Sequence, residues 1–77
     1  MEFTLRGNIY NLTRQDVEKA MNGVSPEQIN KYYIEVNGEK YPPKQVLAES
    51  LGLGRVEFTT MDASNIFRRL GFKLNMI

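Results

Sequence analysis

The sequence predicts a small α+β domain in which short antiparallel β-hairpins, forming a sheet, pack against three to four helices. Three observations predict this class. Asn37-Gly38 lies between two stretches rich in aromatic and β-branched residues, Thr59 and Asp62 precede an amphipathic stretch, and Gly7 lies in a turn near the N-terminus. The 77 residues are short enough for a single domain spanning residues 1–77.

The N-terminal segment predicts a small hairpin. Residues 3–6 and 9–11 read as two strands joined by Gly7-Asn8, because glycine tolerates the positive φ that a two-residue loop requires. Phe3 and Leu5 share one face by the alternation of side chains along a strand.

A first helix is expected to begin at Thr13, with Asp16 three residues on as its capping partner. Asn22-Gly23 is expected to end this helix. Its buried face is predicted from four apolar residues at helical spacing: Val17, Ala20, Met21 and Val24. Ser25 as a cap and Pro26 in the first turn predict a further short helix over residues 25–28.

The central segment predicts a second hairpin that leads directly into a helix. Residues 32–36 form a strand, and Asn37-Gly38 is a strong two-residue turn signal that pairs Val36 with Glu39 and Ile34 with Tyr41. Pro42-Pro43 ends the strand pairing because neither proline has an N–H to donate. The helix that follows is expected to end at Gly52, with a loop over residues 53–57.

The last helix carries its own start and stop signals. Thr59 and Asp62 predict a capping box, and Gly71 predicts a Schellman ending in which Phe72 packs back on Phe67. The buried stripe has helical spacing: Ala63, Ile66, Phe67 and Leu70. Residues 72–76 then alternate as a strand that pairs with another strand.

Composition narrows the function classes. The chain has no cysteine and no histidine, so we expect no metal site, no cofactor and no catalytic residues, and therefore not an enzyme. The N-terminus does not resemble a signal peptide and no stretch is apolar enough to span a membrane, which predicts a cytoplasmic protein. The net charge of +1 means that any binding of nucleic acid needs a local basic patch.

Two groups of residues are candidates for such a patch. Lys40 and Lys44 flank Tyr41 at the hairpin–helix joint, and Arg68 and Arg69 end the last helix. Arg55 and Lys73 are expected near the arginine pair, and Tyr33 is the tyrosine most available for stacking on a base. The alternative is structural. Tyr41 then packs into the core, the lysines only solubilise the joint, and the arginines complement the helix dipole.

The same segments also carry a resemblance. The glycine-turned hairpin, Tyr41-Pro42-Pro43-Lys44 (a YPPK motif), and the ending Leu70-Gly71-Phe72 together resemble a small module of prokaryotic restriction-type proteins. The resemblance covers about residues 31 to 74. In those proteins the module accompanies HNH nuclease or AAA-type restriction domains, so the resemblance implies DNA recognition or a defence-associated role. This chain shows no nuclease or nucleotide-hydrolysing part, so we expect the module to act as a regulator, an adaptor or a subunit.

Two hypotheses of function follow. The first is a non-enzymatic DNA-binding module, linked to restriction, defence or regulation, that uses Lys40, Lys44, Arg55, Arg68 and Arg69 for phosphates and Tyr33 or Tyr41 for stacking or positioning. The alternative is a protein–protein interaction or structural module, including a homodimer. In that case the apolar residues Met76 and Ile77 add a strand to a partner sheet.

Overall fold

The computed structural model describes residues 1–54 and 58–77 and confirms the α+β class. Its described part contains a two-stranded and a three-stranded antiparallel sheet and three helices. The strands are β1 (Glu2–Leu5), β2 (Asn8–Asn11), β3 (Tyr32–Val36), β4 (Glu39–Tyr41) and β5 (Asn75–Met76). The helices are α1 (Arg14–Ala20), α2 (Pro43–Leu51) and α3 (Thr60–Arg69).

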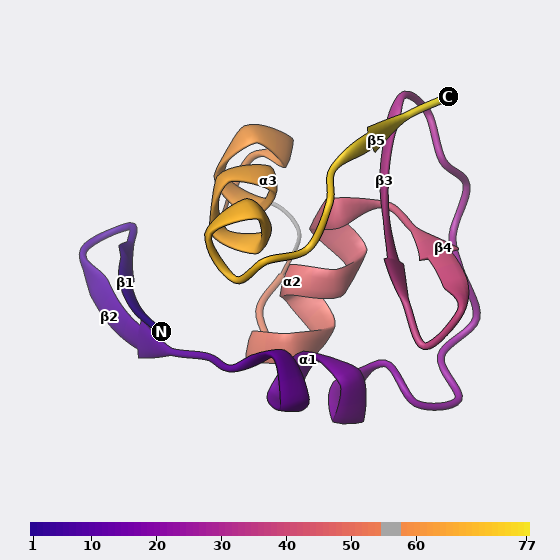
Figure 1. Cartoon of the computed structure of the whole chain (residues 1–77). Coiled ribbons are helices and arrows are strands. Elements are labelled where there is room, and N and C mark those ends of the chain that lie inside the picture. Colours follow the sequence, from indigo (N-terminus) through magenta and orange to yellow (C-terminus); the bar gives the residue numbers. More distant parts are fainter. Residues whose placement is uncertain (55–57) are drawn as a thin grey trace.

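Helix α2 is the centre of the molecule. It packs against α1, α3 and β3, and Figure 1 shows it between α3 and the β3–β4–β5 sheet, with α1 running beneath. The β1–β2 hairpin lies on the opposite side from that sheet (Figure 1). Because α2 contacts helices on one side and a strand on the other, its residues Val46 and Leu47 are completely buried.

The N-terminal hairpin forms, but the predicted turn at Gly7-Asn8 is wrong by one residue. Leu5 pairs with Asn8, so Arg6 and Gly7 form the turn, with φ of 52° and 82°. This register pairs Phe3 with Tyr10, whose rings stack with centroids 5.9 Å apart. It also leaves Leu12 beyond the strand, where it enters the core at 2% exposure. Side-chain packing therefore selects the register, and Arg6 takes the left-handed conformation that follows from it.

The predicted turn and register of the second hairpin are confirmed. Asn37 and Gly38 have φ of 54° and 81°, which is the geometry of a type I′ turn. Val36 pairs with Glu39 and Ile34 with Tyr41. The predicted C-terminal strand also pairs, with β3, although only residues 75–76 form it, and the sheet order is β4-β3-β5.

The start signals of α1 and α3 are confirmed. Thr13 and Asp16 form a capping box, and Thr59 and Asp62 form another, each with both hydrogen bonds present. Helix α1 is shorter than predicted, because it ends at Ala20 and Gly23 turns the chain with a φ of 79°.

The short helix predicted over residues 25–28 does not form. The segment is irregular, and the buried Gln45 side chain on α2 satisfies its backbone instead. Gln45 Nε2 donates to the Ser25 carbonyl at 2.8 Å, and the Glu27 N–H donates to Gln45 Oε1 at 2.9 Å. These two bonds replace the bonds that a helical turn would provide, so the segment stays extended between α1 and β3.

The end of α3 has the predicted Schellman geometry. The Phe72 N–H donates to the Phe67 carbonyl at 2.9 Å, the Gly71 N–H donates to the Arg68 carbonyl at 3.1 Å, and Gly71 has a φ of 96°. The rings of Phe67 and Phe72 meet edge to face with centroids 5.8 Å apart. None of the helices in the described ranges has the length and apolar character needed to cross a bilayer.

Candidate nucleic-acid interface

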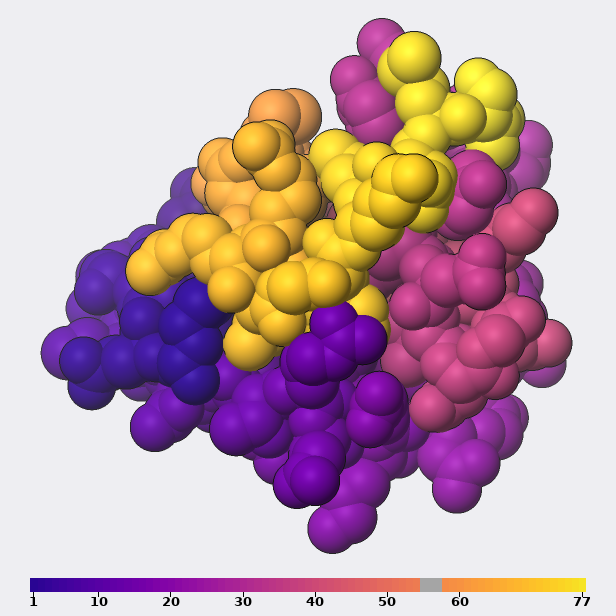
Figure 2. All heavy atoms as spheres, in the orientation of Figure 1, coloured from indigo at the N-terminus to yellow at the C-terminus, as the bar shows by residue number. Residues whose placement is uncertain are grey.

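Cationic side chains from two helices gather where α3 ends. Arg68, Arg69 and Lys73 are exposed there, and Arg14, the first residue of α1, reaches the same place. Figure 2 shows the chain after α3 (yellow) crossing this face directly above α1 (purple). We call Arg14, Arg68, Arg69 and Lys73 the α3-end surface.

The backbone fixes the position of these side chains. The Schellman motif turns the chain at Gly71, so Lys73 follows Arg68 around the end of the helix and both line one open hollow. The Arg14 guanidinium lies over the Phe72 ring, 4.1 Å from its centroid. A Cβ placed on Gly71 would lie 3.3 Å from Arg14 Nη1, so a side chain here would push the guanidinium away by a few tenths of an ångström.

The electrostatics of the α3-end surface are one-sided. Two neighbouring hollows share Arg68 as a lining residue. One is completed by Gly71, Phe72, Lys73 and Leu74. The other is completed by Asn65 and Arg69. No carboxylate belongs to either of these sets of described residues. An anion that enters these hollows therefore meets guanidinium and ammonium groups, the groups that hold phosphate oxygens best.

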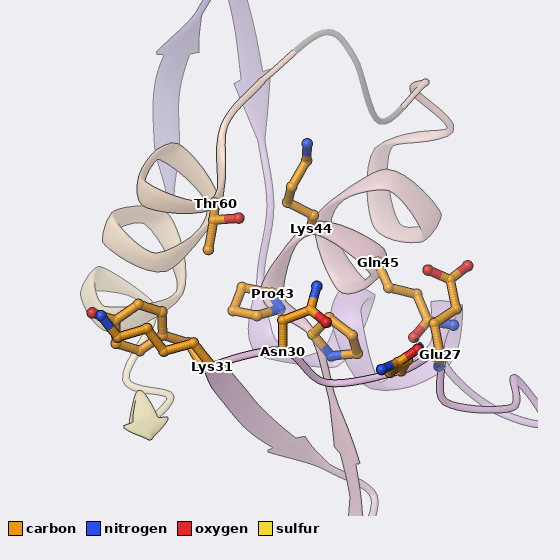
Figure 3. A pocket seen from close by; sticks show the side chains of 10 residues that line it. Glu27, Asn30, Lys31, Pro43, Lys44, Gln45 and Thr60 are labelled. Atoms are coloured by element: carbon orange, nitrogen blue, oxygen red, sulfur yellow. Dashed lines mark hydrogen bonds between the residues drawn. The ribbon is translucent and has the colours of Figure 1, made fainter. Parts of the chain in front are cut away.

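A second concave region lies at the joint between β4 and α2. It is a groove of about 390 Å³ lined by residues from three segments: 27–28 and 30–32, which lead into β3, 42–45 at the start of α2, and Thr60 on α3. Figure 3 shows Lys31 at one end, Glu27 with Gln45 at the other, Asn30 and Pro43 between them, and Lys44 and Thr60 along one side. We call this region the joint groove.

The walls of the joint groove are anchored in the core. Tyr41, at 1% exposure, donates its hydroxyl to the Val24 carbonyl at 2.8 Å. Burial, together with the charge of Glu39, raises the pKa of this phenol above its usual value. Tyr41 and Gln45 thus tie the segment before β3 to β4 and the start of α2, which fixes two of the three segments that line the groove relative to each other.

The residues predicted to bind nucleic acid fall in three places. Arg68 and Arg69 belong to the α3-end surface, and Lys44 lines the joint groove with its ammonium 6.0 Å from the Phe58 ring centroid. Lys40 lies on β4 with its ammonium 5.2 Å from the Tyr33 ring centroid, directly across the strands from Glu35. That carboxylate partly offsets the charge of Lys40.

One predicted contact, Tyr41, lies inside the core, and another, Arg55, falls outside the described part of the chain. Tyr41 is buried and its hydroxyl is bonded to the backbone, so it has no face available for stacking on a base. This placement in the core is the one that the structural alternative described for Tyr41. Arg55 lies outside the described residues, as do residues 56–57 of the loop predicted over 53–57.

Sequence reasoning missed Arg14 and Lys31. The position of Arg14 was a usable signal, because the helix dipole disfavours a cation in the first turn of a helix. A cation found there therefore needs a stabilising contact elsewhere. The stack on Phe72, 58 residues later in the chain (72 minus 14), provides that contact. Lys31 carried no signal, and only the path of the irregular segment before β3 places it in the groove.

Comparison with known proteins gives a family and no more. Within the described residues, no group of three or more acidic side chains is arranged to hold a metal ion. No curated protein and no solved structure matches the chain. A family model described as SCO5918-like matches residues 5–76, which is nearly the whole chain, so this protein belongs to the SCO5918-like family.

Proposed function

We propose that this protein binds nucleic acid, DNA in the first place, through the α3-end surface and performs no chemical step itself. The observation that carries the proposal is that Arg68, Arg69 and Lys73 line hollows with no acidic residue among their described lining, and that Arg14 stacks on Phe72, which lines one of these hollows. A net charge of only +1 makes this concentration of charge significant, because the molecule as a whole does not attract polyanions strongly.

The geometry suits contact with a phosphate backbone. Three of the four side chains are arginines, which present a planar fork of donors to phosphate oxygens. The stack on Phe72 holds Arg14 in place before any ligand arrives, so less side-chain freedom is lost on binding. Each phosphate contact on duplex DNA contributes about 0.9 to the slope of log affinity against log salt. The α3-end surface therefore predicts a slope of about −3 to −4.

Two further features support DNA as the partner. Residues 31–74 resemble the module that accompanies HNH and AAA-type restriction domains, whose work is on DNA. The exposed Lys40 beside the half-buried Tyr33 adds a basic-aromatic pair on the sheet, which suits a secondary contact. A role beside a restriction, defence or regulatory protein in the cytoplasm is the setting that fits this proposal.

A salt titration of binding to a duplex of about 20 base pairs tests the proposal. The double variant Arg68→Ala/Arg69→Ala should bind about 100-fold more weakly at low salt and lower the slope by about two. Lys19→Ala is the matched control, because Lys19 is an exposed cation at the end of α1 whose neighbours include Glu18. Absence of binding at low salt, or equal losses in the two variants, would overturn the proposal.

A second candidate function is association with a protein, including a second copy of this chain. Large apolar side chains are exposed on and beside the edge strand β5, where Met76 is 63% and Ile77 is 71% exposed. An open edge with apolar residues favours addition of a strand from a partner. Light scattering over a range of concentrations tests this, since a constant monomer mass that is unchanged by Met76→Lys rules out the homodimer.

A further inference from the structure

The joint groove differs chemically from the α3-end surface. It is concave, its floor includes two prolines, and its lining is mixed: two lysines, one carboxylate, three amide side chains, a tyrosine and a threonine. Its volume of about 390 Å³ falls in the range of sites that hold one small-molecule-sized group. These properties suit the recognition of a single unit better than the tracking of a phosphate backbone.

Positive and negative side chains lie in different parts of the groove. Lys31 lies at one end, Lys44 lies along one side, and Glu27 lies at the far end (Figure 3). A ligand whose anionic group lies at the Lys31 end and whose uncharged polar part points toward Gln28 and Asn30 matches this arrangement. Amide side chains offer a donor and an acceptor together, which is the pattern that base edges complement.

The two helix starts beside the groove offer few free N–H groups, so the lysines are the main groups there that can hold an anion. Pro42 and Pro43 have no N–H at the start of α2, and the capping box at the start of α3 already uses N–H groups there with the Asp62 carboxylate nearby. Tyr32, next to Lys31, lines the groove with a half-buried ring whose centroid is 5.3 Å from the Lys31 ammonium. This pair offers a flat apolar surface and a cation side by side.

The groove and the α3-end surface are connected through β5. Lys73 is two residues before β5, Met76 of β5 pairs with Tyr32, and the Ile77 N–H donates to the Lys31 carbonyl at 2.9 Å. Two to four extended residues span roughly 7–14 Å. A strand that leaves the α3-end surface can therefore reach the Lys31 end of the groove within a few nucleotides.

We propose that the joint groove holds one unpaired nucleotide of the bound nucleic acid, with its phosphate at the Lys31 end and its base against the proline floor beside Asn30. This inference rests on the proposed function, because the α3-end surface supplies the binding of the adjoining strand. It adds a preference for nucleic acid that carries an unpaired nucleotide, such as a bulge or a short single-stranded end.

The test compares a blunt duplex with the same duplex carrying one bulged nucleotide. The protein should bind the bulged duplex about tenfold more tightly, as expected for one base gaining a stacking surface and a polar lining. Asn30→Trp should abolish this preference, because Asn30 is exposed in the middle of the groove and both lysines remain. Lys31→Ala is the second variant and should reduce the preference several-fold, while Arg68→Ala/Arg69→Ala should weaken both duplexes equally.

The outcomes separate the two proposals. Equal affinity for blunt and bulged duplexes in the unmodified protein overturns the groove proposal and leaves the α3-end surface intact. If neither duplex binds, the proposed function fails, and the groove is then judged alone by an NMR titration with deoxyadenosine monophosphate. Amide shifts at Asn30, Lys31 and Thr60 that exceed those from inorganic phosphate or deoxyadenosine, and that vanish in Asn30→Trp, support the groove; their absence overturns it.

Discussion

The two basic regions of this molecule are built in different ways. The α3-end surface collects four cations around an open turn, and its position depends on local backbone geometry at Gly71 and on one arginine–aromatic stack. The joint groove has fewer cations but a defined cavity, and its position depends on buried side chains that tie distant segments together. The comparison teaches that a fixed backbone turn is enough to bring charged side chains together, whereas a cavity requires buried side chains that hold its walls in place.

The largest expected effect comes from removing the central anchor of the joint groove. Tyr41→Ala should lower the free energy of unfolding by about 3–5 kcal/mol, because it deletes a fully buried ring and its hydroxyl bond to Val24. Urea unfolding followed by circular dichroism measures the loss. Lys40→Ala, at the exposed neighbouring position, is the control and should change stability by less than about 0.5 kcal/mol. A loss below about 1 kcal/mol for Tyr41→Ala would contradict this account.

The second prediction separates the two regions by removing hydrogen bonds alone. Gln45→Leu keeps the approximate volume of the side chain but leaves the Ser25 carbonyl and the Glu27 N–H without this partner. Stability should fall by about 2 kcal/mol, at about 1 kcal/mol for each bond. In NMR spectra, shifts should be confined to the joint groove. Equal shifts at Arg68 and Lys73 would show that the two regions are not independent.

The third prediction addresses the α3-end surface through its backbone. Gly71→Ala places a side chain at a φ of 96° and beside Arg14, so we expect a loss of about 1–2 kcal/mol. The variant should also displace Arg14 and weaken DNA binding, while the joint groove keeps its spectrum. Thermal unfolding and a binding titration measure the two effects. An unchanged melting temperature would mean that the Schellman turn does not fix this surface.

The fourth prediction uses pH to test the anchor in the joint. The folded protein raises the pKa of Tyr41, so its contribution to stability is complete below the pKa of the unfolded phenol, about 10, and is lost as the pH rises through the folded value. Tyr41→Phe should cost about 1 kcal/mol at neutral pH and lose less stability than the parent above pH 10. Parallel alkaline profiles for the two proteins would argue against this role.

The smallest expected effect concerns the arginine that sequence reasoning missed. Arg14→Ala should reduce stability by about 0.5–1 kcal/mol through loss of the stack on Phe72. It should also lower the salt slope of DNA binding by about one unit. A stability loss with an unchanged slope would assign Arg14 a packing role only, and would reduce the α3-end surface to three cations.

Local signals predicted much of the fold and little of the site. Both capping boxes, the Asn37-Gly38 turn and the Gly71 ending depend on residues within a few positions of one another, so their chemistry can be read in order. The turn of the first hairpin failed because the pairing of Phe3 with Tyr10 and the burial of Leu12 outweighed the preference for Gly7 in the first position. The prediction of a helix at residues 25–28 was wrong because a side chain from α2 forms hydrogen bonds with the backbone of this segment.

The sequence by itself determined where α1 and α3 begin, where α2 and α3 end and where the second hairpin turns, because each of these depends on neighbours along the chain. Only the tertiary structure decided that Tyr41 is an anchor, that Arg14 joins Arg68 and Lys73, and that Lys31 and Lys44 border one groove. The physical reason is that burial, stacking and the sharing of a cavity depend on distances between segments far apart in sequence, and close packing of the core sets those distances.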